Sequence, residues 1–136
     1  MQPLIIFLLV ILTFVLLFAV WIFIKKTFKG GFTTKEILYM RSHWMRIIDM
    51  FNGNPKGSIL DADKLLDFAL SKKGIKGTLG EKLKASSGRF SDINGVWAAH
   101  KLRNKIAHDL SDINISEARY ALKHFKKALN DLGAGL

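Results

Sequence analysis

The hydrophobic pattern divides the chain into two parts. Residues 4–24 form an unbroken apolar run of 21 positions in which Thr13 is the only non-apolar side chain. As a helix rising 1.5 Å per residue, this run would be about 31 Å long, close to the thickness of the hydrocarbon layer of a membrane. Beyond Gly30 and Gly31, apolar residues recur at the spacing of amphipathic helices. The pattern predicts a membrane-spanning helix followed by a helical domain.

The flanks of the apolar run indicate its role and its orientation. A cleavable signal peptide would show a basic start and a shorter apolar core, and the run has neither. A core helix that is apolar all round would need protein on every side, which the remaining chain is too short to supply. No charged side chain precedes the run, whereas Lys25, Lys26 and Lys29 follow it. Because basic flanks stay in the cytoplasm, we expect a single-pass protein with its N-terminus outside and its C-terminal domain cytoplasmic.

The expected organisation has three parts: a transmembrane anchor with its basic flank at 1–29, a glycine-rich joint at 30–32, and a helical bundle at 33–133. In the bundle, Thr33 and Glu36 form the pattern of a capping box that opens the first helix. Its predicted core positions are Ile37, Met40, Trp44, Ile47, Ile48 and Phe51. The segment 52–55, Asn-Gly-Asn-Pro, ends this helix.

The later helices are predicted in the same way. A second helix starts between Pro55 and Ser58 and ends near Gly74, and it places Asp63 at the edge of its apolar face, where this acid can pair with a basic group across the bundle. The basic segment 72–84 contains the pattern of a short capped helix at Thr78 and Glu81. Ser91 or Asp92 caps the next helix, and the last one runs from Ser116 to a stop at Gly133. No strand pattern occurs, so the fold class is all-α: a transmembrane helix and a four- or five-helix bundle.

The stretch 96–110, VWAAHKLRNKIAHDL, lies in a predicted helix with two stripes, one more than a surface helix needs. On a helical wheel, one stripe is an ordinary core face: Ala99, Leu102, Ile106 and Leu110. The second stripe lies on another face: Ile93, Trp97, His100, Asn104 and His108. Solvent is left with one narrow face. The pattern predicts a second buried surface, and we expect a homodimer whose interface includes Ile93, Trp97, His100 and Asn104.

Arg103, Asn104 and His108 in this stretch form an RNxxxH motif. The motif and its late position in an all-helical domain resemble those of HEPN domains, and the resemblance covers about residues 33–132. HEPN domains are typically four- or five-helix bundles that dimerise through this helix, and many are metal-independent ribonucleases. The resemblance implies that Arg103, Asn104 and His108 are catalytic residues acting on RNA.

The chemistry of these side chains suits that role. An imidazole can take the proton of a 2′-hydroxyl, so His108 is the candidate acid or base, while the Arg103 guanidinium can stabilise the phosphorane. Five residues apart on one helix, Arg103 and His108 project about 140° apart. Convergence requires Arg103 to reach over, the helix to loosen after Ala107, or two motifs to face each other in a dimer. His100, or Asn104, is positioned to orient His108, and His100 and Asp63 are candidate auxiliary residues.

Charge and composition limit the alternatives. The chain carries 21 basic and 11 acidic residues, a formal net charge of +10, all of it after residue 24. Such a charge suits RNA, but it also suits the anionic cytoplasmic leaflet or the solvation of an apolar protein. There is no cysteine, and the histidine and acid spacing does not favour a metal site, so no metal or cofactor is expected. His43 and His124 have no companion ligand nearby and are interpreted as structural or surface residues.

Two functions remain open from the sequence. The first is a membrane-anchored HEPN-like endoribonuclease, a possible toxin or defence component, with a possible separately encoded antitoxin or regulator as partner. The second is a non-catalytic membrane-anchored helical adaptor, whose motif helix serves only as a surface for self-association or partner binding. In that second interpretation Asn104 and His108 merely line a helix end, and Arg103 lies along the bundle surface.

Overall fold

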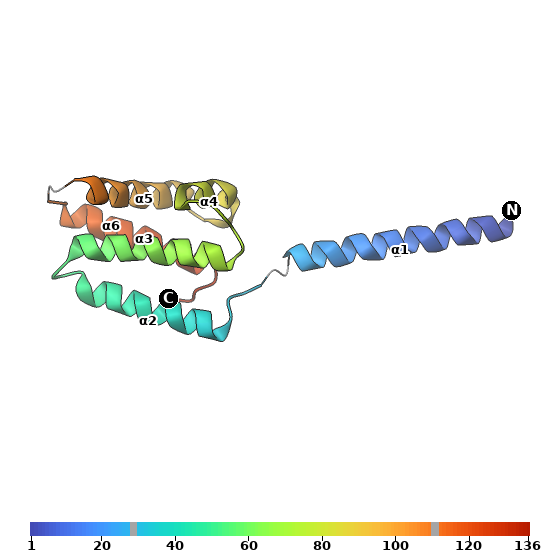
Figure 1. Ribbon diagram of the computed structural model, residues 1–136, viewed down its shortest axis with the longest axis horizontal. Helices are drawn as coiled ribbons and strands as arrows, with labels where there is room; N and C mark the ends of the chain where they lie inside the picture. Colours follow the sequence, from blue (N-terminus) through green and yellow to red (C-terminus); the bar gives the residue numbers. More distant parts are fainter. Residues whose placement is uncertain (28–29, 110–111) are drawn as a thin grey trace. The chain divides into compact units, whose positions relative to one another are not determined.

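The computed structural model describes residues 1–27, 30–109 and 112–136, and the chain divides into two compact units, Met1–Gly31 and Phe32–Leu136 (Figure 1). Within these residues, six α-helices and one short 3-10 helix are present and no strand. The all-α prediction is confirmed for this part of the chain. Lys29 of the predicted basic flank and Leu110 of the predicted core stripe lie outside the described residues, as do the side chains of Lys25 and Lys26.

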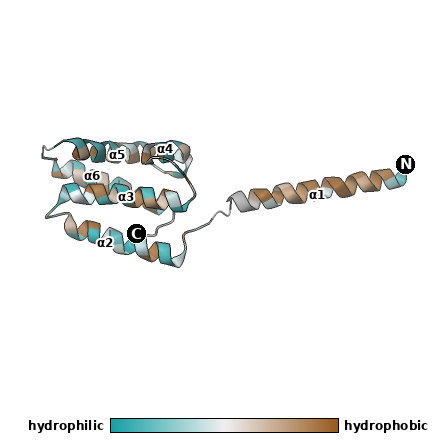
Figure 2. Cartoon of the chain, viewed as in Figure 1, coloured by the Kyte–Doolittle hydropathy of each residue, from teal (hydrophilic) through white to brown (hydrophobic). Residues whose placement is uncertain are grey.

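The first unit consists mainly of α1 (Gln2–Thr27). Its stretch Gln2–Phe23 has a mean hydropathy of 3.2, and none of it is buried inside the protein. Figure 2 shows hydrophobic residues along nearly all of this helix. The hydroxyl of Thr13 donates a 2.7 Å hydrogen bond to the carbonyl of Val10, so the one polar side chain of the predicted run is satisfied within the helix. This helix is long and apolar enough to cross a membrane.

The second unit is a helical bundle. It contains α2 (Thr34–Met50), α3 (Pro55–Lys72), α4 (Leu79–Ala85), the 3-10 helix η1 (Ser87–Arg89), α5 (Ile93–His108) and α6 (Ile115–Asp131). The central helix is α3, which packs against α2, α4, α5 and α6, with α2 and α5 on different sides of it (Figure 1). The largest fully buried apolar side chains are Met40, Ile47, Ile59, Leu66, Leu70, Leu83, Val96, Phe125 and Leu129. These residues form one core shared by all five helices.

Side-chain caps set the helix boundaries, and most of them are the predicted ones. Both capping boxes form, at Thr33 with Glu36 and at Thr78 with Glu81. Asp92 caps α5 by accepting a hydrogen bond from the backbone of Gly95. The prediction for the last helix is one residue late, because the side chain of Asn114 accepts from the Ser116 amide and lets α6 begin at Ile115.

The predicted core of α2 is wrong at one position. Ile47 is 1% exposed, but Ile48 is 44% exposed. Adjacent residues on a helix project about 100° apart, so a helix that is covered on one side buries only one of the two. The residues after α6 contact the same helix, because the Arg41 side-chain Nε donates to the backbone carbonyl of Gly135 at 3.0 Å. This outward side of α2 therefore carries exposed apolar side chains next to a fixed C-terminus.

Candidate functional site

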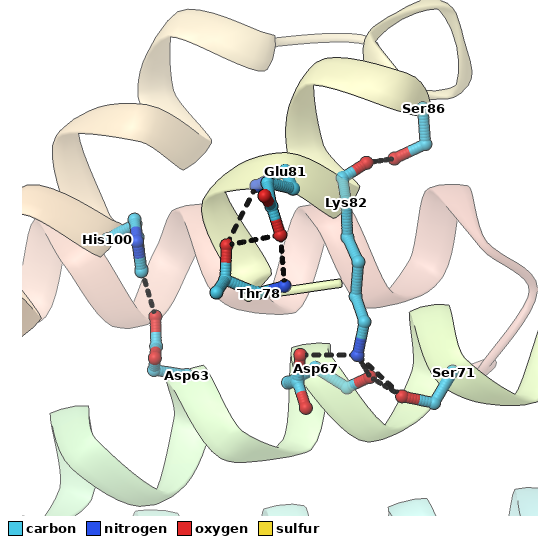
Figure 3. A network of polar contacts seen from close by, with 8 residues as sticks. All are labelled: Asp63, Asp67, Ser71, Thr78, Glu81, Lys82, Ser86 and His100. Carbon is cyan, nitrogen blue, oxygen red and sulfur yellow. Dashed lines mark hydrogen bonds and ion pairs between the residues drawn. The ribbon is translucent and has the colours of Figure 1, made fainter. Parts of the chain in front are cut away.

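Four polar side chains of the bundle meet between α3 and α5. Asp63 of α3 is 4% exposed, and it faces three residues of α5: His100, Arg103 and Asn104. The Nδ1 atom of His100 lies 2.7 Å from Asp63 Oδ1 (Figure 3). Arg103 Nε lies 3.2 Å from the other carboxylate oxygen. The predicted pairing of Asp63 with a basic group across the bundle is confirmed, and it involves two such groups.

The hydrogen-bond roles in this cluster follow from its chemistry. A carboxylate only accepts, so His100 Nδ1 donates to Asp63. A guanidinium only donates, so Arg103 Nη1 donates to Asn104 Oδ1 at 3.0 Å. The amide nitrogen of Asn104 therefore faces His100 Nε2, at 3.4 Å. The Arg103 N–H at Nε makes no hydrogen bond, so its 3.2 Å approach to Asp63 is an ion pair only.

A cleft of about 510 Å³ opens beside this cluster. Its lining comes from three helices and the segment before α4: Asp63, Lys64, Asp67, Gly77, Thr78, Leu79, Gly80, His100, Arg103 and Asn104. Gly77 has a φ of +107°, and a Cβ there would lie 2.6 Å from Glu81 Oε2. This turn therefore requires glycine to place the capped start of α4 beside the cleft.

A buried lysine holds α4 against α3. The Nζ of Lys82 lies 2.7 Å from both Asp67 Oδ1 and Ser71 Oγ, and its side chain is 6% exposed (Figure 3). Its backbone carbonyl accepts a 2.6 Å hydrogen bond from the buried Ser86 hydroxyl. A buried ammonium needs such partners because desolvation is costly. The start of α4, which lines the cleft through Leu79 and Gly80, is thus held in place by charge as well as by the packing of Leu83 in the core.

The capping box of α4 makes the start of this helix sensitive to acid. The backbone N–H of Thr78 and then its hydroxyl hold the pKa of the Glu81 carboxyl below its ordinary value of 4.5. A lowered pKa adds stability that is complete above the ordinary value and is lost as the pH falls through the lowered one. We expect the Thr78 amide and the α4 backbone to lose hydrogen-exchange protection on acidification below 4.5. Amide hydrogen exchange measured by NMR on the native chain and on Glu81→Gln would show this loss, since protection in the variant should not depend on pH in this range. Equal pH profiles would contradict it.

The structure brings together four of the predicted site residues and leaves one apart. Asp63, His100, Arg103 and Asn104 form the cluster, whereas His108 is exposed at the last position of α5. No hydrogen bond in the described part of the chain joins His108 to His100 or Asn104, and the orientation of His108 by either residue stays a prediction. Both ring nitrogens of His100 and both ends of the Asn104 amide are engaged inside the cluster. Among the described residues, the His108 side chain has no hydrogen bond or ion pair.

The geometry also bears on how Arg103 and His108 relate. The helix continues without loosening through Ala107 and ends at His108, with Asp109 in extended conformation. The guanidinium of Arg103 reaches over to Asn104, which lies one turn before His108 on the same side of the helix. The Arg103 side chain therefore leaves its own face of the helix for that of Asn104, and the convergence of Arg103 with His108 stays a prediction.

The second stripe of α5 is largely covered within the bundle. Ile93 and Trp97 pack partly buried against the core, and a Cβ on Gly80 of α4 would lie 3.6 Å from the Trp97 ring. His100 and Asn104 face Asp63 and Arg103. Burial of this stripe therefore does not by itself require a second copy, and the dimer through Ile93, Trp97, His100 and Asn104 stays a prediction.

The two remaining histidines are structural. His124 of α6 is 6% exposed, with Nδ1 3.2 Å from Asp92 Oδ2 and its ring 4.2 Å from that of Tyr120. His43 contacts the backbone carbonyl of Tyr39 at 2.9 Å on α2. No group of three or more His, Cys, Asp or Glu side chains in the described part of the chain could hold a metal ion.

The sequence pattern did not predict the buried lysine that holds α4 beside the cleft. Lys82 reads as one of several solvated lysines in a basic segment, and only its long-range partners on α3 reveal its burial. Lys64 also lines the cleft, beside Asp63 in sequence. The capping box at Thr78 and Glu81 was the one local signal that a short helix stands there.

Comparison of the chain with protein-family models, with curated proteins and with solved structures gave no significant match.

Proposed function

We propose that this chain is a membrane-anchored, metal-independent endoribonuclease of the HEPN type. The observation that carries the proposal is the position of Arg103. Its guanidinium lines a cleft of about 510 Å³, is held by the buried Asp63, and leans onto Asn104, one turn before the exposed His108. RNA cleavage without a metal needs a fixed cation and an accessible imidazole, and Arg103 and His108 offer these two groups on one helix.

In the proposed reaction, His108 takes the proton of a ribose 2′-hydroxyl, and the 2′-oxygen forms a bond to the adjacent phosphorus. The bond from phosphorus to the 5′-oxygen breaks, and that oxygen leaves with a proton donated by an acid. His108 can equally be this acid if another group acts as the base. Arg103 stabilises the negative charge of the phosphorane through paired N–H donors, which a lysine lacks. Lys64, on the cleft lining, adds a second positive charge for the RNA backbone.

We also propose that α1 anchors the protein through residues 4–24, with the bundle on the cytoplasmic side and acting as a homodimer. The length and hydropathy of α1 support the anchor, and the basic residues that follow it in sequence support the orientation. A dimer would place two copies of Arg103 and His108 near each other and supply a base and an acid to one phosphate.

The second candidate is the non-catalytic adaptor, and one observation favours it. His100 and Asn104 are satisfied inside the cluster, as in a polar network that only fixes the packing of two helices. Under this alternative, Arg103 is a structural ion-pair partner of Asp63.

Incubation of the purified full chain in nanodiscs with varied RNAs in the presence of EDTA tests the proposal. We expect cleavage to products with a 2′,3′-cyclic phosphate and a 5′-hydroxyl, because the attacking group is the neighbouring 2′-oxygen. RNA that carries a 2′-O-methyl group at the cleavage site is the control and should resist. Intact RNAs after incubation with dimeric protein would contradict the nuclease and favour the adaptor.

A further inference from the structure

The outward face of α2 carries large apolar side chains that the bundle does not cover. Leu38, Met45 and Ile48 are 59%, 61% and 44% exposed. At 100° per residue they fall within about 80° of one another on the helix, so they form one stripe along its length. A stripe of this kind on a soluble protein marks a surface that meets an apolar partner.

A groove of about 510 Å³ runs beside this stripe. It is lined by four residues of α2, by one of α6 and by the C-terminal end: Arg41, Trp44, Met45, Ile48, Lys126, Gly135 and Leu136. Arg41 is fixed there by its hydrogen bond to Gly135. The groove thus combines an apolar lining with two basic side chains.

The charge around the stripe is mainly positive. Lys35 and Arg41 are exposed residues of α2 on this side, Lys126 of α6 lines the groove, and Asp49 lies near the end of the stripe. Residues 30–136 contain 18 basic and 11 acidic side chains, a net charge of +7, because three of the 21 basic residues precede them. Apolar side chains bordered by cations are typical of helices that lie in the interface of an anionic membrane.

The chain connection places α2 near such a surface. Only residues 28–33 separate the end of α1 at Thr27 from the start of α2 at Thr34. Seven Cα–Cα steps span at most about 25 Å when fully extended. If α1 crosses the bilayer, the start of α2 cannot move far from the headgroups, and the tether gives the surface a high local concentration of lipid.

We propose that α2 docks on the anionic cytoplasmic leaflet, with Leu38, Met45 and Ile48 inserted at the boundary of headgroups and acyl chains. Arg41 and Lys126 then face lipid phosphates. The inference rests on the proposed membrane anchor, but it does not depend on ribonuclease activity. A second copy of the chain is a poorer occupant, because a two-fold pairing through this face would bring the same cations together. The bilayer supplies both the apolar layer and the negative charge.

The absence of cysteine from the chain allows a direct test with single labels. The full chain would be reconstituted in vesicles of phosphatidylcholine with phosphatidylglycerol, with an environment-sensitive fluorophore on Met45→Cys and a quencher on the acyl chains. Lys101→Cys is the control for the docked face, because Lys101 is an exposed residue of α5. Helices α5 and α2 lie on different sides of α3 (Figure 1). Thr13→Cys in α1 reports the anchor independently.

We expect the label at 45 to shift to the blue and to be quenched several-fold more than the label at 101. The difference should shrink in pure phosphatidylcholine and with Lys126→Glu, but not with Lys84→Glu on α4. If the label at 13 is quenched while the labels at 45 and 101 are quenched equally weakly, the docking is overturned and the anchor stays in place. No quenching at 13 would overturn the anchor and the docking with it. Energy transfer that is stronger between copies labelled at 45 than between copies labelled at 101, without lipid quenching at 45, would overturn the bilayer as the occupant and identify a second copy on this face.

Discussion

Replacement of Asp63 by alanine should lower the free energy of unfolding of the bundle by about 3 kcal/mol, at the low end of the cost of breaking a buried ion pair. The carboxylate is the common partner of His100 and Arg103, and it is 4% exposed. Its removal leaves the Nδ1–H of His100 without an acceptor and the Arg103 guanidinium without its counter-charge. The Arg103 side chain is 31% exposed and can regain some water, which keeps the cost from being larger. Urea unfolding of the full chain in nanodiscs, followed by near-ultraviolet circular dichroism, would measure it.

The matched control is Asp61→Ala on the same helix. Asp61 lies 3.8 Å from Lys64, whose side chain is 72% exposed, and such a surface pair contributes about 0–1 kcal/mol. Asp63→Asn should fall between the two, because the amide keeps the shape and one acceptor but loses the charge. Equal midpoints for Asp61→Ala and Asp63→Ala would show that the cluster does not hold α3 and α5 together.

The fold follows from the sequence wherever the signal is local. Thr33 with Glu36 and Thr78 with Glu81 are three residues apart, so the sequence alone shows which backbone N–H groups they cap. The failure at Ile48 has a different origin. Periodicity shows that Ile47 and Ile48 are both apolar, but the width of the buried face depends on how many neighbours cover the helix, and α2 is covered mainly by α3.

The site was predictable only in part, because side-chain direction is decided by distant partners. The helical face of Asp63 and the line of His100 and Asn104 can be read from spacing. That Arg103 turns back onto Asn104 cannot, since a flexible side chain takes its direction from the buried carboxylate across the bundle. Lys82 is the extreme case, because it belongs to a lysine-rich segment, while its partners are 11 and 15 residues away on α3.

The same geometry identifies the right control for the catalytic test. His124 is buried between α6 and the start of α5, where a Cβ on Gly95 would already clash with its ring. Its replacement would disturb the bundle and confuse any loss of activity with loss of fold. His43 is half-buried on α2, its ring bonded only to a carbonyl one turn back, and α2 does not line the cleft. His43→Ala is therefore the matched histidine variant.

His108→Ala should reduce RNA cleavage by about 10²–10⁴-fold, the contribution of a positioned proton-transfer group, and leave the unfolding midpoint unchanged because the side chain is exposed.

Arg103→Ala should reduce the cleavage rate by about 10²–10³-fold, because the phosphorane loses its stabilising cation. It should also lower the free energy of unfolding, because Asp63 loses an ion-pair partner. Arg103→Lys should restore part of the stability but little of the activity, since an ammonium cannot donate two parallel hydrogen bonds. Single-turnover rates with EDTA, measured beside His43→Ala at near-native activity, would separate these effects. Cleavage that survives His108→Ala would contradict the proposed mechanism, and cleavage that survives both replacements would show that the RNxxxH residues are not the active site.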